Sequence, residues 1–178
     1  MTTSSSMNPQ ITIRQATKED IALIRDLAEI IFPYTYGKML SPEQVDYMME
    51  WMYSPNNLVA GLDSGQEYFI VEMAGEPVSY AGIAPQKDDP DGTKVFELMR
   101  LYILPEHQKT GLGKLLFEHV CNHIRSKGFA KCRMMLHVNR ENPAVRFYLH
   151  QGMRILYSKD FDIGNNFWMN DHIMGMDL

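Results

Sequence analysis

The chain has 178 residues, of which 45% are hydrophobic and 22% charged, and its formal net charge at pH 7 is −5. This composition indicates a globular protein, and the lack of a basic stripe argues against nucleic-acid binding. No apolar run approaches the roughly 20 residues of a membrane span, which argues against a membrane partner. The two cysteines are too few for a disulfide scaffold, so we expect a cytoplasmic protein with reduced thiols. Residues 1–10, rich in Ser and Thr, are expected to form a flexible tail before a single domain over residues 11–178.

The first part of the domain is predicted to contain one strand and two helices. Apolar residues alternate from Ile11, which is typical of a strand. Thr17 with Asp20 predicts the start of a first helix, because the two side chains can cap the free N–H groups there. Ser41 followed by Pro42 predicts the start of a second helix, since Pro suits a first turn.

The remainder is predicted as three strands, a helix, a strand, a helix and two strands. The strands cover residues 68–73, 78–84, 95–104, 131–138, 154–161 and 167–177, and the helices cover residues 112–126 and 142–152. Strands that alternate with helices favour an α/β fold in which helices cover a mixed sheet.

A glycine-bearing turn joins a predicted strand to a predicted helix within residues 101–114. The first N–H groups of a helix have no internal partner, and glycine lets an anion approach them closely. A P-loop would need Gly at position 108, and a dinucleotide fingerprint would need a third Gly at position 116; Gln108 and Leu116 exclude both. The remaining pattern, Gln-x-x-Gly-x-Gly after Leu-Tyr-Ile-Leu-Pro, resembles the acetyl-CoA pyrophosphate loop of the GNAT superfamily of N-acetyltransferases.

A second segment, residues 136–153, resembles the other signature of that superfamily: a strand, then Asn, Ala, aromatic-Tyr and Gly. One position departs from the pattern, because Asn142 lies two residues before Ala144, where the superfamily has Asn three residues before; Glu141 stands there instead. Asn142 is therefore either a cofactor contact or a helix cap.

The resemblance implies a GNAT fold, with a mostly antiparallel mixed sheet of about seven strands, about four flanking helices and a splayed V between the fourth and fifth strands. It also implies acetyl-CoA as cosubstrate, no metal, and direct attack by an amine on the acetyl group. The residues that it assigns to cofactor binding are Leu101, Tyr102, Ile103, Gln108, Lys109, Thr110, Gly111, Leu112, Gly113, Lys114 and Asn142.

Two catalytic residues follow from the resemblance. A primary amine has a pKa near 10.4, so removing its proton at pH 7 costs roughly 4.6 kcal/mol and needs a carboxylate, directly or through a water chain. Glu97 lies where the superfamily's histone acetyltransferases carry their catalytic Glu, and Tyr148 matches the Tyr near the thioester sulfur. A solvated edge residue and a packed helix aromatic are the respective alternatives. Strand alternation predicts that Glu97 shares a side of its strand with Met99 and Leu101.

The acceptor is expected to be a small cationic amine. Aromatic and acidic residues gather in the segment between the first two helices and in the last hairpin, a composition that suits an elongated cation. These segments are similar to bacterial polyamine-type acetyltransferases, and an aromatic-rich core is the competing explanation. The candidate contacts are Phe32, Tyr34, Tyr36 and Trp168.

Several alternatives stay open. The acceptor could be a protein N-terminus or a lysine, or the chain could be a regulatory module that binds coenzyme A without turnover. The protein could be a monomer or a homodimer. His119 and His123 have a zinc-like spacing but are expected to form a polar helix flank, and His137 could line the acceptor channel or project to solvent.

Overall fold

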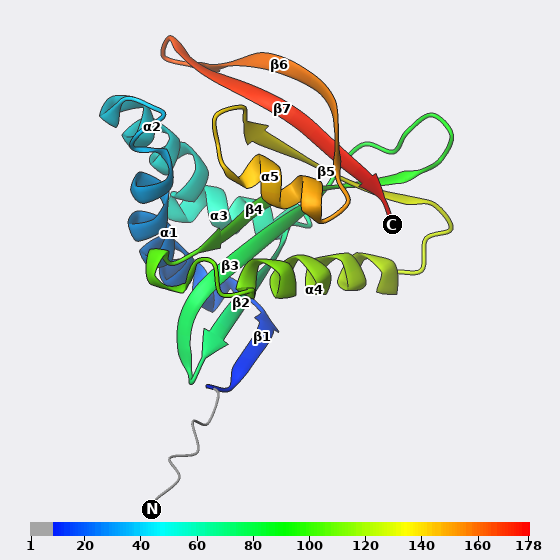
Figure 1. The fold of residues 1–178 in the computed structure, drawn as a ribbon, viewed down its shortest axis with the longest axis horizontal. Helices are drawn as coiled ribbons and strands as arrows, with labels where there is room; N and C mark the ends of the chain where they lie inside the picture. Colours follow the sequence, from blue (N-terminus) through cyan, green and yellow to red (C-terminus); the bar gives the residue numbers. More distant parts are fainter. Residues whose placement is uncertain (1–8) are drawn as a thin grey trace, which may run out of the picture.

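The computed structural model describes residues 9–178 as a seven-stranded sheet covered by helices (Figure 1). The expected tail over residues 1–10 lies almost wholly outside the described residues. The elements are β1 (Ile11–Gln15), η1 (Lys18–Asp20), α1 (Ile21–Tyr36), α2 (Pro42–Tyr53), α3 (Pro55–Asp63), β2 (Glu67–Met73), β3 (Glu76–Pro85), β4 (Lys94–Ile103), η2 (Pro105–His107), α4 (Leu112–Ser126), β5 (Cys132–Asn139), α5 (Ala144–His150), β6 (Arg154–Gly164) and β7 (Phe167–Asp177). The strand order is β1-β2-β3-β4-β5-β7-β6, and among these neighbours β4 and β5 alone are parallel. The predicted α/β fold is confirmed.

The predicted order was wrong in one place, because three helices rather than two separate β1 from β2. The start of α3 carries the same Ser-Pro signal as the start of α2: the hydroxyl of Ser54 accepts a hydrogen bond from the N–H of Asn57 at 3.4 Å, as that of Ser41 does from Gln44 at 3.2 Å. The sequence therefore held the information for this helix.

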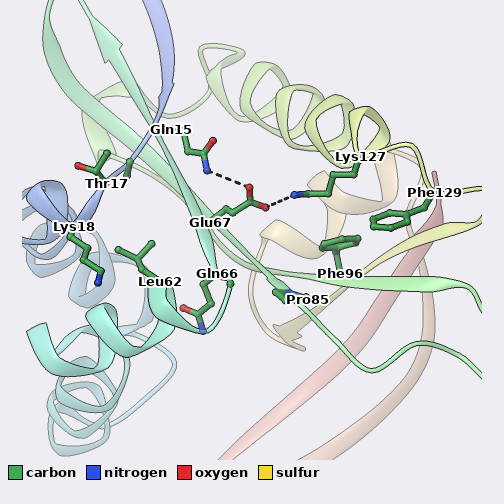
Figure 2. A pocket seen from close by; sticks show the side chains of 12 residues that line it. Gln15, Thr17, Lys18, Leu62, Gln66, Glu67, Pro85, Phe96, Lys127 and Phe129 are labelled. Atoms are coloured by element: carbon green, nitrogen blue, oxygen red, sulfur yellow. Dashed lines mark hydrogen bonds and ion pairs between the residues drawn. The ribbon is translucent and has the colours of Figure 1, made fainter.

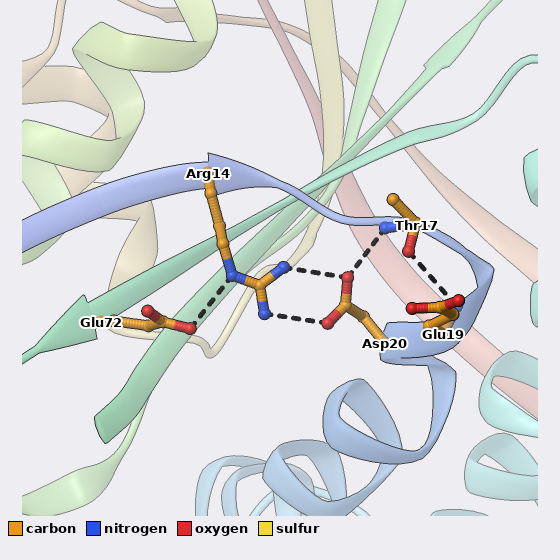
Figure 3. Close-up of polar contacts among 5 residues, drawn as sticks. All are labelled: Arg14, Thr17, Glu19, Asp20 and Glu72. Carbon is orange, nitrogen blue, oxygen red and sulfur yellow. Dashed lines mark hydrogen bonds and ion pairs between the residues drawn. The ribbon is translucent and has the colours of Figure 1, made fainter. Parts of the chain in front are cut away.

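The chain enters α1 through a network around Arg14 (Figure 3). The guanidinium of Arg14 donates to both carboxylate oxygens of Asp20, at 2.9 and 2.8 Å, and to Glu72 at 3.0 Å. Asp20 also accepts the N–H of Thr17 at 2.8 Å, so the predicted capping box is confirmed, although it caps η1 just before α1. The Arg14 guanidinium lowers the pKa of Asp20, and the network fixes β1 to both β2 and the first helix.

Two hydrophobic cores lie on opposite faces of the sheet. Alternate residues of β2 show the division: Phe69 and Val71 belong to the core under α4 and α5, whereas Tyr68 and Ile70 belong to the core under α1, α2 and α3. This follows from the period of two along a strand. The helices therefore form a layer on each face, as Figure 1 shows.

The parallel pair β4–β5 opens into a V. The two strands pair from Lys94 with Cys132 to Glu97 with Met135 and no further. Beyond this point β4 continues along β3, and β5 continues along β7. The predicted splay between the fourth and fifth strands is confirmed, and the edge of β4 that faces β5 is left without a partner strand over residues 98–103.

Because β4 contains a β-bulge, its side chains point in directions that differ from those predicted. Gly82 pairs with Arg100 and Ile83 with Leu98, so Met99 is an extra residue. Leu101 consequently packs into the core under α4, whereas Met99 packs into the core under α1. The prediction that Glu97 and Leu101 share a side is wrong, because one inserted residue reverses the alternation after it.

Candidate functional site

The turn from β4 to α4 presents a row of free backbone N–H groups. Within the described residues, the N–H groups of the six residues 109–114 have no hydrogen-bond acceptor; the series ends at Leu115, whose N–H donates to the carbonyl of Gly111 at 3.1 Å. No side chain caps α4. Free N–H groups at a helix start, together with the helix dipole, form a site for an anion.

The two glycines of this loop, Gly111 and Gly113, are required for different structural reasons. Gly111 has φ of +88°, and a Cβ added to it would meet no atom within 4 Å, so the backbone there is open to a ligand. A Cβ on Gly113 would lie 3.3 Å from the ring of Phe147 and 3.4 Å from Ile103, so this glycine lets α4 pack closely against α5 and β4. The corner is not sealed by side chains.

Of the other predicted loop residues, Gln108 and Thr110 make hydrogen bonds within the loop, whereas Lys109 and Lys114 are exposed. The side-chain amide of Gln108 donates to the carbonyl of Ile103 at 3.2 Å, and its N–H donates to Pro105, so Gln108 holds the loop in shape. The hydroxyl of Thr110 donates to the carbonyl of His107 at 2.5 Å. Lys109 and Lys114 are exposed at the rim, where their charges favour an anion.

A cavity of about 560 Å³ opens on the side of the V that faces α1, α2 and the β6–β7 hairpin. The hairpin is held over α2 by Gln44, whose amide donates to the carbonyl of Trp168 at 2.7 Å, and by Tyr47, whose hydroxyl donates to that of Ile163 at 2.8 Å. The polar lining residues are Glu97, Arg100, His137, Asn139, Asp162 and Asp171, and the aromatic ones are Phe32, Tyr36, Trp51, Tyr102 and Phe161.

Glu97 and His137 meet in this cavity, so the open question about His137 is answered: it lines the cavity. Nε2 of His137 lies 3.9 Å from Oε1 of Glu97, and Nδ1 lies 3.8 Å from Oδ2 of the buried Asp171. These two carboxylates, Asp171 above all, raise the pKa of His137. The other oxygen of Glu97 accepts a hydrogen bond from Gln86 at 2.8 Å, and its side chain is 23% exposed.

Tyr36 and Tyr102 line the cavity and pack in the same core as the fully buried Tyr53 and Tyr80. The hydroxyls of Tyr36 and Tyr102 are 2.9 Å apart, and those of Tyr53 and Tyr80 are 2.7 Å apart. The guanidinium of Arg100 lies 5.2 Å from the centre of the Tyr53 ring and donates to the carbonyl of Met99 at 3.1 Å. Burial raises the pKa values of Tyr36 and Tyr102, so their hydroxyls stay protonated and available for hydrogen bonds.

Tyr148 lies on α5 and is buried. Its ring packs against Phe117 and Phe147, with ring centres 6.2 and 5.3 Å away. Burial, and then the nearness of Tyr102, raise the pKa of Tyr148. Among the described residues its hydroxyl makes no hydrogen bond to another side chain, which leaves it available as a donor.

The comparisons with known proteins decide the family. The model of the acetyltransferase (GNAT) family matches residues 24–153. The chain belongs to this family. It is therefore an acyltransferase of the N-acetyltransferase class, as the two sequence signatures predicted.

Three relatives illustrate the range of similarity. A spermidine N(1)-acetyltransferase of Thermoplasma acidophilum is 27% identical over 146 residues, which cover 82% of this chain and 89% of that protein. N-acetyltransferase 8 of Rattus norvegicus is 27% identical over 86 residues; the match covers 48% of this chain and only 39% of the rat protein. The crystal structure of the PaiA N-acetyltransferase of Thermoplasma acidophilum, in complex with coenzyme A, superposes with a TM-score of 0.76 at 22% identity, covering 95% of this chain and 99% of that one.

Two features of the GNAT chain fit acetyl-CoA, the acetyl donor of the family. The free N–H groups of residues 109–114 suit a diphosphate, and the open corner at Gly111 leaves it room. The edge of β4 without a partner strand, beside Leu101, Tyr102 and Ile103, offers backbone groups to the amide groups of a pantetheine arm; the carbonyls of Tyr102 and Ile103 also accept hydrogen bonds from Ser79 and Gln108.

Asn142 is engaged with its own helix. Its side-chain oxygen accepts a hydrogen bond from the N–H of Ala144 at 2.9 Å, and the residue is buried. The structure thus supplies the capping role, and a contact of Asn142 with the cofactor stays a prediction.

The predicted acceptor residues divide into two pairs. Phe32 and Tyr36 line the cavity, whereas Tyr34 is 60% exposed and Trp168 is 51% exposed, and neither of these lines it. Both were chosen because they are aromatic residues in the right segments, and helix and strand periodicity places them on the outer face. Arg100, Asn139 and Phe161 line the cavity but were not predicted, since tertiary packing alone brings them together.

A second groove of similar volume lies between β1, β2, α3 and the end of α4 (Figure 2). Its central carboxylate, Glu67, is already paired: it accepts from Gln15 at 3.3 Å and lies 2.9 Å from both His123 and Lys127. None of the candidate catalytic residues lines this groove. His123 is thus part of a surface network, in agreement with the predicted polar helix flank.

Residues 9–178 contain neither a cluster of metal-ligating side chains nor a helix suited to a membrane. No group of three or more His, Cys, Asp or Glu side chains there could hold a metal ion. In the same part of the chain, no helix has the length and apolar character needed to cross a membrane.

Proposed function

We propose that this GNAT enzyme transfers the acetyl group of acetyl-CoA to a primary amine of a small cationic, polyamine-like molecule. The observation that carries the proposal is the cavity beside the V, whose wall combines three carboxylates, Glu97, Asp162 and Asp171, with five aromatic rings. Carboxylates pair with ammonium groups, and aromatic faces attract them. The similarity to a spermidine N(1)-acetyltransferase over 82% of the chain supports the same class of acceptor.

Acetyl-CoA supplies an acetyl group that is activated by its thioester. The backbone of residues 109–114 would hold the diphosphate, and the free edge of β4 would align the pantetheine arm. This arrangement would direct the reactive end of the arm towards the cavity where β4 and β5 diverge. The residues of the chain therefore position the two substrates and handle the protons.

Glu97 is proposed as the general base. Its Oε2 already accepts a hydrogen bond from Gln86, so Oε1, on the side of His137, is the atom placed to accept a proton from the acceptor amine. An ammonium group must lose its proton before it can attack, at a cost of roughly 4.6 kcal/mol at pH 7. A carboxylate at the cavity wall can accept the proton that the nitrogen releases as its bond to the acetyl carbon forms, because the nitrogen is then far more acidic than the free ammonium group.

Tyr148 is proposed as the hydrogen-bond donor to the leaving sulfur. Its raised pKa keeps the hydroxyl protonated, and transfer of that proton to a thiolate of ordinary pKa is uphill. Stabilisation of the developing negative charge by the O–H group is the role that these properties favour.

The experiment measures thiol release from acetyl-CoA across a panel of diamines, polyamines, amino acids and peptides. We expect turnover with small cationic amines, and a loss of about tenfold or more in kcat for Tyr148→Phe and Glu97→Gln. Tyr157→Phe is the matched control, because Tyr157 is an exposed tyrosine outside the cavity.

Other outcomes would replace the proposal. Turnover with peptides alone would indicate a protein N-terminal or lysine acetyltransferase. Binding of coenzyme A without thiol release for any amine would indicate a regulatory module.

A further inference from the structure

Asp171 is a buried carboxylate that the fold leaves without hydrogen bonds. Its side chain is 1% exposed, and neither carboxylate oxygen has a hydrogen-bond partner among the described residues. The nearest cationic group is the imidazole of His137, at 3.8 Å, which is beyond hydrogen-bond distance. Asp171 nevertheless lines the cavity of the proposed acceptor site.

Such an arrangement is unfavourable for folding alone. Burial of a charged group without hydrogen bonds costs several kcal/mol, and a neutral side chain of the same shape is often as stable or more so. The backbone of Asp171 is fixed between two strands, since it pairs with Asn139 of β5 and Lys159 of β6. The residue is thus held within the sheet, and its unmet hydrogen-bonding capacity lies at the wall of the cavity.

Neither Arg100 nor His137, the two basic residues of the cavity wall, forms a hydrogen bond with Asp171. Arg100 lies over the ring of Tyr53 and donates to Met99, and it forms no ion pair with Asp171 within the described part of the chain. His137 stands between Asp171 and Glu97, so the two carboxylates are separate sites rather than one pair. An acceptor whose reacting amine lies at Glu97 would thus meet a second anionic group further along the cavity.

From this geometry we infer that Asp171 binds a second ammonium group of the acceptor, so that the enzyme selects diamines and polyamines over monoamines. The inference rests on the proposed function, and it assigns specificity to Asp171 and proton transfer to Glu97. A charge-assisted hydrogen bond to each carboxylate oxygen would satisfy the atoms that folding leaves unpaired.

The test compares diaminobutane, with an amine at each end, with aminobutane in the wild type and in Asp171→Asn. We expect the KM for diaminobutane to rise about tenfold or more in the variant, because a buried charge-assisted contact is lost. The KM for aminobutane and the KM for acetyl-CoA are expected to stay within about twofold, since neither uses Asp171. Asp160→Asn is the matched control, because it removes an exposed carboxylate of the same hairpin that is paired with Arg140 at 2.6 Å. It should change the KM for neither amine.

Melting temperatures distinguish an effect of Asp171→Asn on ligand binding from an effect on folding or on turnover. At about pH 9, where the stabilising effect of protonated His137 on the fold is largely lost, Asp171→Asn removes a buried charge that makes no hydrogen bond, so it should melt at the same temperature as the wild type or higher. Diaminobutane should raise the melting temperature of the wild type but not that of the variant, with aminobutane at equal ionic strength as reference.

Three results would overturn the inference. They are an equal rise in KM for both amines, an unchanged KM for diaminobutane, and a melting temperature of the variant several degrees below that of the wild type. The last result would show that Asp171 stabilises the fold. If the wild type acetylates neither amine, the proposed function fails, and the melting experiment still decides the inference. A diaminobutane-dependent shift that Asp171→Asn abolishes would support it, and the absence of that shift would overturn it.

Discussion

The carboxylate of Glu97, in the last residue pair that joins β4 to β5, faces the imidazole of His137, two residues beyond that pair on β5, with Oε1 and Nε2 3.9 Å apart. The strands diverge after Glu97 pairs with Met135, and the imidazole lines the cavity beside this divergence. The same ring reaches towards Asp171 on β7. His137 thus lies between a candidate base, Glu97, and a buried carboxylate, Asp171, near the point where the two strands of the V separate.

The position of His137 predicts a dependence of stability on pH. Its pKa is raised in the folded protein, by Asp171 first and then by Glu97. Its contribution to stability is therefore fully present below the unfolded-state pKa of about 6.5 and is lost as the pH rises through the folded-state value. We expect His137→Gln to lower the free energy of unfolding at about pH 5.5 and to have a smaller effect at about pH 9, measured by urea denaturation. A difference that stays constant or grows with pH would contradict this.

Tyr148→Phe should affect catalysis rather than binding. The pKa of Tyr148 is raised, so the hydroxyl remains a donor throughout the usual assay range. We expect kcat to fall about tenfold or more, with the KM for acetyl-CoA changed by less than about threefold. Unchanged kcat, or an equal loss in Tyr157→Phe, would show that Tyr148 is only a packed aromatic residue.

Gly111→Ala tests the open corner of the cofactor loop. An alanine at φ of +88° is strained by about 1–2 kcal/mol, and its methyl group would project into the open space at this corner of the loop. We expect the dissociation constant for coenzyme A to rise about tenfold. Gly92→Ala is the matched control, because Gly92 has φ of +84° and equally open surroundings but lies outside the loop. Equal weakening by both variants would indicate strain rather than a binding role.

The network at Arg14 predicts an acid-sensitive contribution to folding. The pKa of Asp20 is lowered by Arg14, so its stabilising effect is present above the unfolded-state pKa and is lost as the pH falls through the folded-state value. Asp20→Asn should cost about 1 kcal/mol at neutral pH and much less near pH 2. Asp63→Asn, which alters an exposed ion pair with Lys18, should cost less. Equal costs in the two variants at neutral pH would contradict the assignment.

The sequence alone was sufficient to predict the bounds of those helices and strands whose limits are set by local residues. The bounds of α4 and of β7 were predicted as the structure has them, since α4 is amphipathic and lies between Gly111 and Gly128, and β7 follows the turn at Gly164. The bulge at Met99 could not be predicted, because it arises from the register of β4 against β3. The direction of every later β4 side chain, including Leu101 and Tyr102, depends on that one residue.

The candidate site was predictable only in part. The loop proposed to bind the cofactor is a contiguous segment, and its short motif was enough to locate the free N–H groups around Gly111. The cavity joins residues that are far apart in the chain, such as Tyr36, Arg100 and Asp171. Composition indicated the aromatic and acidic character of its walls, but it could not separate Tyr36, which lines the cavity, from the exposed Tyr34.

The central claim is that the backbone N–H groups of residues 109–114 bind the diphosphate of coenzyme A, and an amide NMR titration tests it most directly. The account predicts large, saturable shifts of these amides with coenzyme A, shifts along β4 near Leu101–Ile103, and little change at Glu67 in the second groove. No shift in residues 109–114 at saturating coenzyme A, or shifts confined to the groove around Glu67, would contradict it.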